Sequence, residues 1–371
     1  MAIPTVKFNK NGKLKIMHIT DTHLDHDNID MSLFLINWAC KKEMPDVAVI
    51  TGDNVHNDDN AEVTKSYIDR LMRIFDDLSI PVAITYGNHD SEVGAMSRSE
   101  LTDYYNTHSS SITYGDGPDS ATYCVPVYSQ NGDKVKFNLW IFDSNDYDEK
   151  GRYGCVLPHQ VEWYKKKSDE ITAANGGEKI YSMAFQHMIV ADVYDALKKA
   201  DKHRFYSFHH MYEKNDYYMF DPKVHNFGTL NETPCSGYYN YGQFEAMVEK
   251  GDVLAMFTGH DHTNAFGVKH KGIDIVNSLS TRYNGDRFSS QYGYRILEIE
   301  ESDTSKYTSR NERWYNMFKK PDFAELKKSG DEFGLKTAKC VTSKGRIQKL
   351  YTRVGRKFVT LITGRQVTYP H

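Results

Sequence analysis

Seven polar residues in five short segments of this 371-residue chain have the chemistry of metal ligands. The segments are DTH at 21–23, GDN at 52–54, GNHD at 87–90, QH at 186–187 and GHDH at 259–262. The donors that they offer are Asp21, His23, Asp53, Asn88, His187, His260 and His262. Carboxylate, amide and imidazole groups suit Zn, Fe or Mn, and the lack of a nearby thiolate argues against a cysteine zinc site or an iron–sulfur cluster. We therefore expect two divalent metal ions and hydrolysis by a metal-activated water.

Apolar strands must deliver these segments to one place. The predicted strands at 14–20, 46–51 and 81–87 each end at a polar segment, and helical patterns near 30–43 and 67–78 separate them. Two later apolar strands, at 179–187 and 252–262, carry the remaining histidines at their ends. Because open α/β sheets place their sites at the carboxyl ends of strands, we expect these ends to meet.

The rest of the chain continues this alternation of strands and helices, which indicates an α/β layered fold. We expect further strands at 122–128, 136–143, 264–269, 273–278 and 293–299. We also expect a helix at 158–174, which begins at Pro158. Residues 203–240 are aromatic, histidine-rich and turn-rich, and we expect this insertion to rim the active site.

Two of the motif residues have predicted roles of their own. Asp53 is the natural bridging ligand, because a carboxylate has two oxygens and an imidazole offers one nitrogen. His89 sits beside Asn88 at a strand end, where adjacent side chains can aim at metal and at substrate. We therefore interpret His89 as the catalytic residue that stabilises or protonates the leaving oxygen.

The ordered motifs resemble those of the calcineurin-like metallophosphoesterase superfamily over residues 14–300. The stretch 235–264 further resembles the intracellular purple-acid-phosphatase-like branch. This resemblance implies a four-layer αββα sandwich of two mixed sheets, spanning 1–305, with a hydroxide bridging two metals and His89 as the acid. It also implies one metal held by Asp21, His23, Asp53 and His262, and the other by Asp53, Asn88, His187 and His260.

The chain departs from that pattern at His56, three residues after Asp53. The corresponding position is Tyr in purple acid phosphatases and Asp in the protein phosphatases. The resemblance therefore implies no purple colour and leaves the acidic partner of His89 unassigned. Asp90 and His56 are the candidates for that supporting position.

Charge is distributed unevenly along the chain. Residues 306–371 hold 16 Lys and Arg against 5 Asp and Glu, although the formal net charge of the whole chain is −4. This predicted basic C-terminal extension either contacts nucleic acid, acidic lipid or an acidic partner, or docks on the acidic remainder of the chain.

The five scattered cysteines indicate reduced structural thiols. Without a long apolar run or a leader-like start, we expect no membrane span and a cytoplasmic location.

These features favour a phosphomonoesterase acting on a phosphorylated small molecule or a phosphoprotein. A phosphodiesterase acting on cyclic nucleotides or nucleic acid is the alternative, because both reactions use the same ion pair. A metal-bearing scaffold with a recruiting basic tail is the third hypothesis. Three sets of side chains outside the motifs have less direct assignments. We interpret His209, His210 and His225 as packed or exposed loop residues, and the nearby aromatic residues as packing at the rim or as a surface for base stacking. Arg282 and Arg287 form either surface ion pairs or a clamp for a substrate phosphate.

Overall fold

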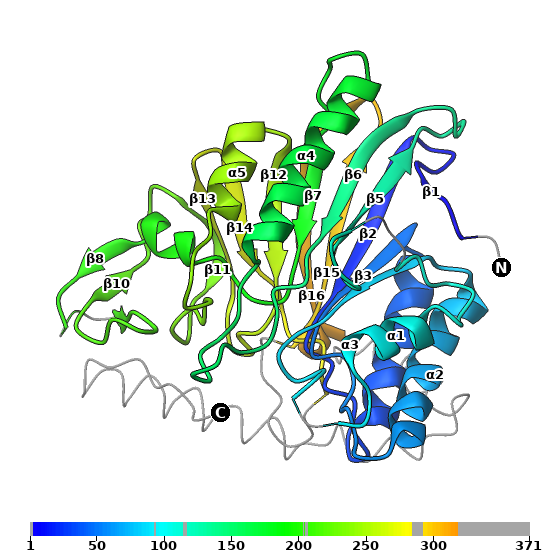
Figure 1. Cartoon of the computed structure of the whole chain (residues 1–371), viewed down its shortest axis with the longest axis horizontal. Coiled ribbons are helices and arrows are strands. Elements are labelled where there is room, and N and C mark those ends of the chain that lie inside the picture. Colours follow the sequence, from blue (N-terminus) through cyan, green and yellow to red (C-terminus); the bar gives the residue numbers. More distant parts are fainter. Residues whose placement is uncertain are drawn as a thin grey trace.

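Two β-sheets pack face to face at the centre of the fold, and helices cover their outer faces (Figure 1). The computed structural model describes residues 3–92, 94–113, 117–202, 204, 207–283 and 292–317. This is the predicted four-layer αββα sandwich of two mixed sheets, which is confirmed.

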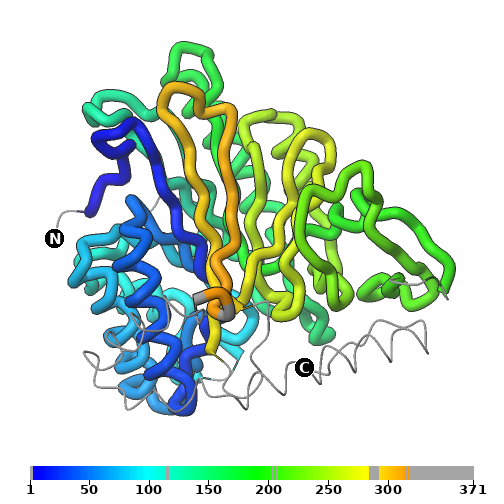
Figure 2. Tube along the Cα trace, turned by 180° about the vertical axis from the view of Figure 1, so that it is seen from behind, coloured from blue at the N-terminus to red at the C-terminus, as the bar shows by residue number. Residues whose placement is uncertain are grey.

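The smaller of the two sheets has the strand order β16-β15-β2-β3-β4. Its strands are β2 (Lys13–Ile19), β3 (Val47–Thr51), β4 (Val82–Thr85), β15 (Gly293–Glu300) and β16 (Asp303–Arg313). The first three run parallel, and β15 joins β2 in antiparallel register (Figure 2). The carboxyl ends of β2, β3 and β4 therefore lie at one edge.

The larger sheet has the order β1-β5-β6-β7-β12-β14-β13-β11. Its strands are β1 (Val6–Lys7), β5 (Tyr123–Tyr128), β6 (Val135–Ile141), β7 (Ser182–Phe185), β11 (His225–Thr229), β12 (Val253–Thr258), β13 (Ala265–His270) and β14 (Ile273–Asn277). At its centre β6, β7, β12 and β14 are parallel, so the ends of β7 and β12 share one edge.

Helices occupy the two outer layers (Figure 1). They are α1 (Ile29–Glu43), α2 (Ala61–Leu78), α3 (Arg98–Tyr105), α4 (Pro158–Ala174), α5 (Gln243–Lys250) and the short α6 (Trp314–Met317), with a 3₁₀ turn, η1, at Ala191–Ala196. Asn60 caps α2 by accepting a hydrogen bond from the Glu62 amide, and Pro158 opens α4 as predicted.

The buried apolar side chains form three layers that correspond to the sandwich. Successive residues of β2 point to opposite faces, so Ile16 joins the core between the sheets and Met17 joins the core under α1 and α2. A third cluster, which includes Trp140 and Met247, lies between the larger sheet and helices α4 and α5. Burial on both faces explains why the central parallel strands are almost continuously apolar.

The structure adds two features to the predicted organisation: a small sheet that includes part of the insertion, and a strand that crosses residue 305. Within the insertion, β10 (Tyr217–Met219) pairs with β9 (Phe208–His209) on one side and with β8 (Lys198–Ala200) on the other, in a small separate sheet that was not predicted. The predicted boundary between residues 305 and 306 falls within β16. From residue 318 onward the predicted basic extension lies outside the described residues.

Candidate metal centre

Five loops at the carboxyl ends of strands bring the predicted ligands together. Asp21 and His23 follow β2, Asp53 follows β3 and Asn88 follows β4, while the remaining histidines follow β7 and β12. The carboxyl ends of these strands lie at the same end of the sandwich, so both sheets contribute residues to one site. The positions of the motifs after strands led us to expect this.

The first group of donor atoms comes from Asp21, His23, Asp53 and His262, whose ligand atoms lie within 4.8 Å of one another. His23 Nε2 lies 3.0 Å from His262 Nε2 and 3.4 Å from Asp53 Oδ2. Nitrogen and carboxylate oxygen atoms converge on one point, as the coordination sphere of a single cation requires.

The second group comes from Asp53, His187 and His260, again within 4.8 Å. His187 Nε2 lies 3.3 Å from Asp53 Oδ2 and 3.2 Å from His260 Nδ1. Asn88 directs its Nδ2 to the Tyr147 hydroxyl at 2.8 Å, and its buried Oδ1 has no hydrogen-bond partner among the described residues. That amide oxygen is therefore available as a neutral ligand.

Asp53 belongs to both groups. Its Oδ1 accepts the His89 backbone amide at 2.9 Å, whereas its buried Oδ2 has no hydrogen-bond partner in the described part of the chain. Buried polar atoms are nearly always partnered, so this oxygen points to a ligand. The donor set of carboxylates, imidazoles and an amide fits two divalent ions of the Mn, Fe or Zn type.

Backbone conformation at the strand ends is unusual. Asp21, His23, Asp53 and His260 have φ angles of 53°, 41°, 51° and 70°, in the left-handed region that costs energy for residues with a side chain. Gly87 allows the loops to approach closely, because a Cβ there would lie 2.3 Å from Asp53 Oδ1 and 2.7 Å from His187 Nε2. The chain thus accepts local strain where the donors converge.

Hydrogen bonds behind the ligands hold them in place. His187 Nδ1 donates to the Thr51 carbonyl at 2.9 Å, which turns Nε2 toward the site. The Asp90 carboxylate accepts the amides of Asp53, Asn54 and Gly87 at 2.7, 2.9 and 2.7 Å, and so ties two ligand loops together. Burial and the nearby charge of Asp53 raise the pKa of Asp90 to about 6.

The electrostatics of the protein without its metals reflect this crowding. Burial opposes ionisation of Asp21, but the hydrogen bond from His262 and the charge of His187 bring its pKa to about 2. Against the same burial, Asp53 raises the pKa of His187 to about 9. Burial lowers the pKa of His23 and of His260 to about 3, so both imidazoles are neutral and ready to donate to a cation.

His89 stands apart from both groups of donors. Its ring centre is 5.4 Å from that of His23, and its side chain is 47% exposed. Its Nδ1 contacts Glu92 Oε2, and Glu92 Oε1 accepts a hydrogen bond from the Tyr147 hydroxyl at 3.0 Å. Since Tyr147 also accepts from Asn88, one chain of hydrogen bonds joins a candidate metal ligand to the residue predicted to face the substrate.

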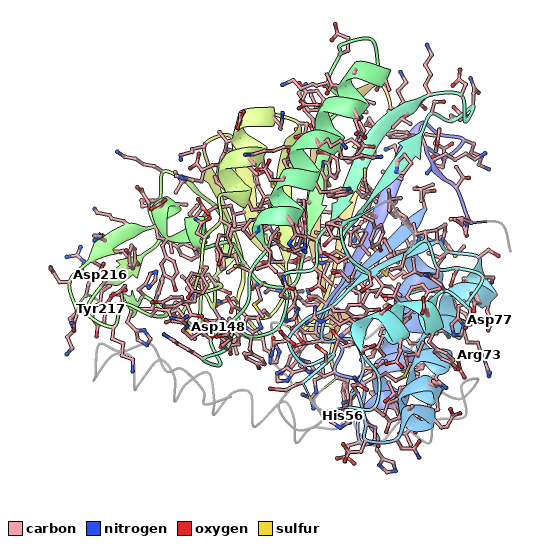
Figure 3. The ribbon with its side chains drawn as sticks, viewed as in Figure 1. His56, Arg73, Asp77, Asp148, Asp216 and Tyr217 are labelled. Atoms are coloured by element: carbon pink, nitrogen blue, oxygen red, sulfur yellow. The ribbon has the colours of Figure 1, made fainter. Side chains whose placement is uncertain are left out.

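Sequence reasoning missed Glu92 and Tyr147. The three-residue spacing from His89 to Glu92 could have suggested the first, but nothing in the sequence links Tyr147 to a loop 59 residues away. The two candidates named for this supporting position lie elsewhere. Asp90 holds backbone amides, and His56 is exposed at the surface (Figure 3).

The histidines of the insertion pack on neighbouring rings or are exposed, whereas Arg282 lies beside the candidate metal centre. His210 packs on Tyr194 with ring centres 3.9 Å apart, and His225 stacks on Phe220 at 4.0 Å, while His209 is exposed. The Arg282 amide donates to the Asp21 carbonyl at 3.1 Å, which puts it beside the first donor group. Arg287 lies outside the described residues.

The cysteines and the helix lengths were two further features considered in the sequence. Cys40, Cys155 and Cys235 are free thiols, and Cys340 lies beyond the described part. Within the described ranges no helix is both long and apolar enough to cross a membrane.

Comparison with known proteins supplies an independent test. A family model described as calcineurin-like phosphoesterase matches residues 14–264, a range that includes all seven candidate ligands. The chain is 23% identical over 314 residues to "Probable inactive purple acid phosphatase 14" of Arabidopsis thaliana, which covers 76% of this chain and 73% of that protein. It is 24% identical over 290 residues to "Phosphatase DCR2" of Saccharomyces cerevisiae, covering 69% and 45%. A solved dimetal phosphatase from Danio rerio aligns with a TM-score of 0.49 at 13% identity, covering 80% of this chain and 98% of that one.

Proposed function

The chain belongs to the calcineurin-like phosphoesterase family, and from this premise we propose that it hydrolyses phosphomonoesters. Membership makes it a binuclear metal-dependent phosphoester hydrolase. The proposal adds the monoester as the substrate class, the assignment of the seven ligands and the role of His89. The substrate would be a phosphorylated small molecule or a phosphoprotein.

One observation carries the ligand assignment. Asp53 Oδ2 lies 3.4 Å from His23 Nε2 in one group and 3.3 Å from His187 Nε2 in the other. A single carboxylate oxygen is therefore positioned between two converging sets of donors, as a bridging ligand would be. Two ions held there would lower the pKa of a coordinated water and neutralise charge on the phosphoryl oxygens.

The chain's own residues supply the remaining steps. His89 engages Glu92 through Nδ1, so Nε2 is the atom free to give a proton to the departing alcohol oxygen. Its backbone amide is hydrogen-bonded to Asp53 Oδ1, which sets the distance between the acid and the bridging ligand. Glu92 and Tyr147 keep the imidazole in this orientation.

Arg282 favours a monoester over a diester. A monoester carries one more negative charge than a diester. The Arg282 backbone amide donates to the Asp21 carbonyl, and the positive charge of its guanidinium acts on His23 of the first donor group. Its side chain is 30% exposed, it contacts Asp25 at 3.4 Å, and its buried Nε has no partner in the described ranges. A phosphoryl oxygen would satisfy that nitrogen.

The Arabidopsis relative is named as a probable inactive enzyme, and the yeast relative as a phosphatase. This chain retains a complete set of candidate ligands together with His89, and its His89 has a carboxylate partner. A metal-bearing scaffold would need neither of the last two features. We therefore favour an active enzyme.

The test is turnover by purified protein loaded with Mn, Fe or Zn, with elemental analysis of bound metal. The panel contains p-nitrophenyl phosphate, bis-p-nitrophenyl phosphate and a cyclic nucleotide. We expect two metals per chain and a clear preference for the monoester. Preference for a diester would replace the proposal by the phosphodiesterase, and two bound metals without any turnover would replace it by the scaffold.

A further inference from the structure

Exposed aromatic side chains gather beside the metal centre. Among the residues that the structure describes, five large apolar side chains are exposed, and three of these are Tyr238, Tyr239 and Tyr241 at 42%, 44% and 42%. Scattered exposed apolar residues need no explanation, but three within four positions form a patch. We call these three residues the tyrosine patch.

The patch is connected through Tyr153 to the second group of candidate metal ligands. The Tyr153 ring meets the His260 ring edge-on at 4.4 Å and lies parallel to Tyr147 at 5.8 Å. The Tyr153 carbonyl accepts the Tyr238 amide at 3.1 Å. A Cβ at Gly237 would lie 2.3 Å from the Gly154 carbonyl oxygen, so the two segments pack with no room for a side chain.

Arg152 holds the patch in a defined arrangement. Its guanidinium lies 3.4 Å from the centre of the Tyr238 ring, and its Nη2 donates to the Tyr239 hydroxyl at 2.9 Å. Asp148, labelled at the lower left of Figure 3, neutralises this guanidinium by accepting a hydrogen bond from its Nε at 2.6 Å. Because Arg152 is already paired, its role here is to orient tyrosines and not to bind phosphate.

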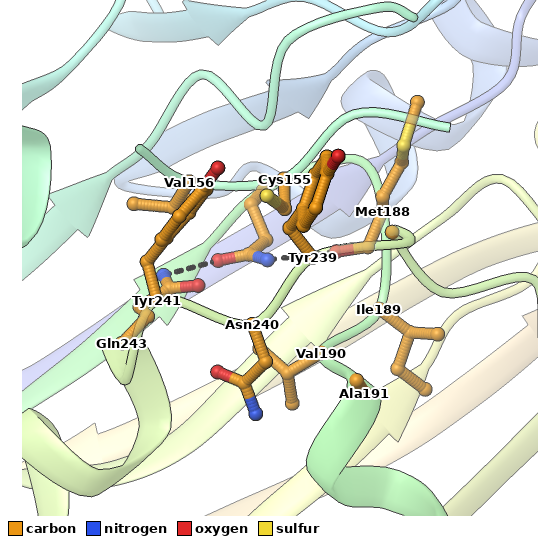
Figure 4. Close-up of a pocket in the computed structure, with 12 residues that line it drawn as sticks. Cys155, Val156, Met188, Ile189, Val190, Ala191, Tyr239, Asn240, Tyr241 and Gln243 are labelled. Atoms are coloured by element: carbon orange, nitrogen blue, oxygen red, sulfur yellow. Dashed lines mark hydrogen bonds between the residues drawn. The ribbon is translucent and has the colours of Figure 1, made fainter. Parts of the chain in front are cut away.

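Two rings of the patch stand side by side over a small pocket. Tyr239 and Tyr241 are nearly parallel, with centres 5.7 Å apart and planes inclined by 24° (Figure 4). Cys155 and Val156 also line this pocket, and so does Gln186, the neighbour of the candidate ligand His187. One wall of the pocket is therefore built by the segment that carries a candidate ligand of the second donor group.

We propose that the tyrosine patch binds the nucleobase of a nucleoside monophosphate whose phosphate lies at the metal centre. The proposal rests on the proposed function and names its substrate class. Ring faces that are exposed but held in place can stack on any base at little cost in conformational entropy. The Tyr147 and Tyr153 pair separates the patch from the ligands, so the bound planar group must be linked to the phosphate through a spacer. A nucleotide has that spacer in its ribose, whereas phosphotyrosine and aryl phosphates carry the ring directly on the ester oxygen.

Adenosine binding tests the site without requiring catalysis. Metal-loaded protein is titrated calorimetrically with adenosine and, for comparison, with ribose. We expect adenosine to bind and ribose not to bind. The double variant Tyr239→Ala/Tyr241→Ala should weaken adenosine binding on the order of tenfold to a hundredfold, the usual effect of removing a stacking ring. The matched variant Tyr241→Phe keeps both rings and the hydrogen bond from Arg152 to the Tyr239 hydroxyl, and should bind as the natural protein does.

Kinetics give a second readout with adenosine 5′-monophosphate and glycerol 3-phosphate. The double alanine variant should raise KM for the nucleotide on the order of tenfold, with kcat and the KM for glycerol phosphate unchanged. Equal adenosine and ribose binding would overturn the proposal and leave the patch to another occupant, such as a protein partner. Equal changes in KM for both substrates would overturn it as well. If no monoester is hydrolysed but adenosine binds through the two rings, the nucleobase site stands and the monoesterase function fails.

Discussion

Replacing Glu92 by Gln isolates the contribution of the hydrogen-bond chain behind His89. The glutamine keeps the shape of the side chain but removes the charge that faces His89 Nδ1. The Tyr147 hydroxyl loses its charged acceptor at the same time, while the ligand atoms of both donor groups are untouched. We expect two bound metals per chain and a lower kcat.

The magnitude follows from the geometry and the exposure of the pair. A hydrogen bond to a charged group contributes ~1.5–3 kcal/mol, and the solvent around an exposed pair reduces this. The side chains of His89 and Glu92 are 47% and 40% exposed, so the lower end applies. About 1.4 kcal/mol corresponds to roughly a tenfold loss in kcat. His89→Ala should cost more, about a hundredfold to ten-thousandfold, because it removes the acid itself.

Steady-state kinetics on the single and double variants provide the assay. If Glu92 acts only by orienting His89, then Glu92→Gln has no further effect in the His89→Ala background. Glu62→Gln is the matched control, since Glu62 is an exposed glutamate on α2 whose ion-pair partner is Lys65, three residues away on the same helix. Independent, multiplying losses in the double variant would refute the reasoning, as would an unchanged kcat in Glu92→Gln.

Three further outcomes test other parts of the structure. Asp53→Asn should release metal from both positions, and full metal content by elemental analysis would contradict the shared ligand. Gly87→Ala should lower metal content as well, because its Cβ would meet Asp53 Oδ1 at 2.3 Å; an unchanged metal-to-protein ratio would show that the loops can separate. Burial, with the charge of Arg295, lowers the pKa of His18 to about 3 from its ordinary 6.5. The unfolded state then binds this proton more readily, so the free energy of unfolding should fall as pH drops from 6.5 toward 3, by up to about 1.4 kcal/mol per pH unit. His18→Gln should lose that part of the slope in urea unfolding, and identical slopes would contradict it.

The positions of strands and of the converging residues were predictable because both follow from local patterns. Apolar runs such as β3 are buried on both faces, and the residue after each run is where a parallel sheet exposes its end. The family resemblance implied that Asp53 would belong to both sets of donors, and its Oδ2 faces a histidine of each set. The αββα sandwich and the two-metal class are confirmed.

What could not be predicted depends on contacts between distant segments. Tyr147 reaches Asn88 and Glu92 from a loop after β6, a relation that no spacing in the sequence encodes. Asp90 was a candidate partner for His89, but its carboxylate is enclosed by three backbone amides whose positions exist only after folding. Likewise, β16 crosses the predicted domain boundary because pairing with β15, and not charge composition, determines where the sheet ends.

The donors of the centre come from residue 21 through residue 262 and from both central sheets. Metal binding would therefore join residues that are far apart in the sequence, from 21 to 262, and would cross-link the first and second halves of the polypeptide. During synthesis, neither proposed donor group is complete until the segment after β12 has left the ribosome, so on the proposed assignment both ions would bind late. Removal of the ions should in turn weaken the packing between the two sheets before it disrupts the strand pairing within either sheet.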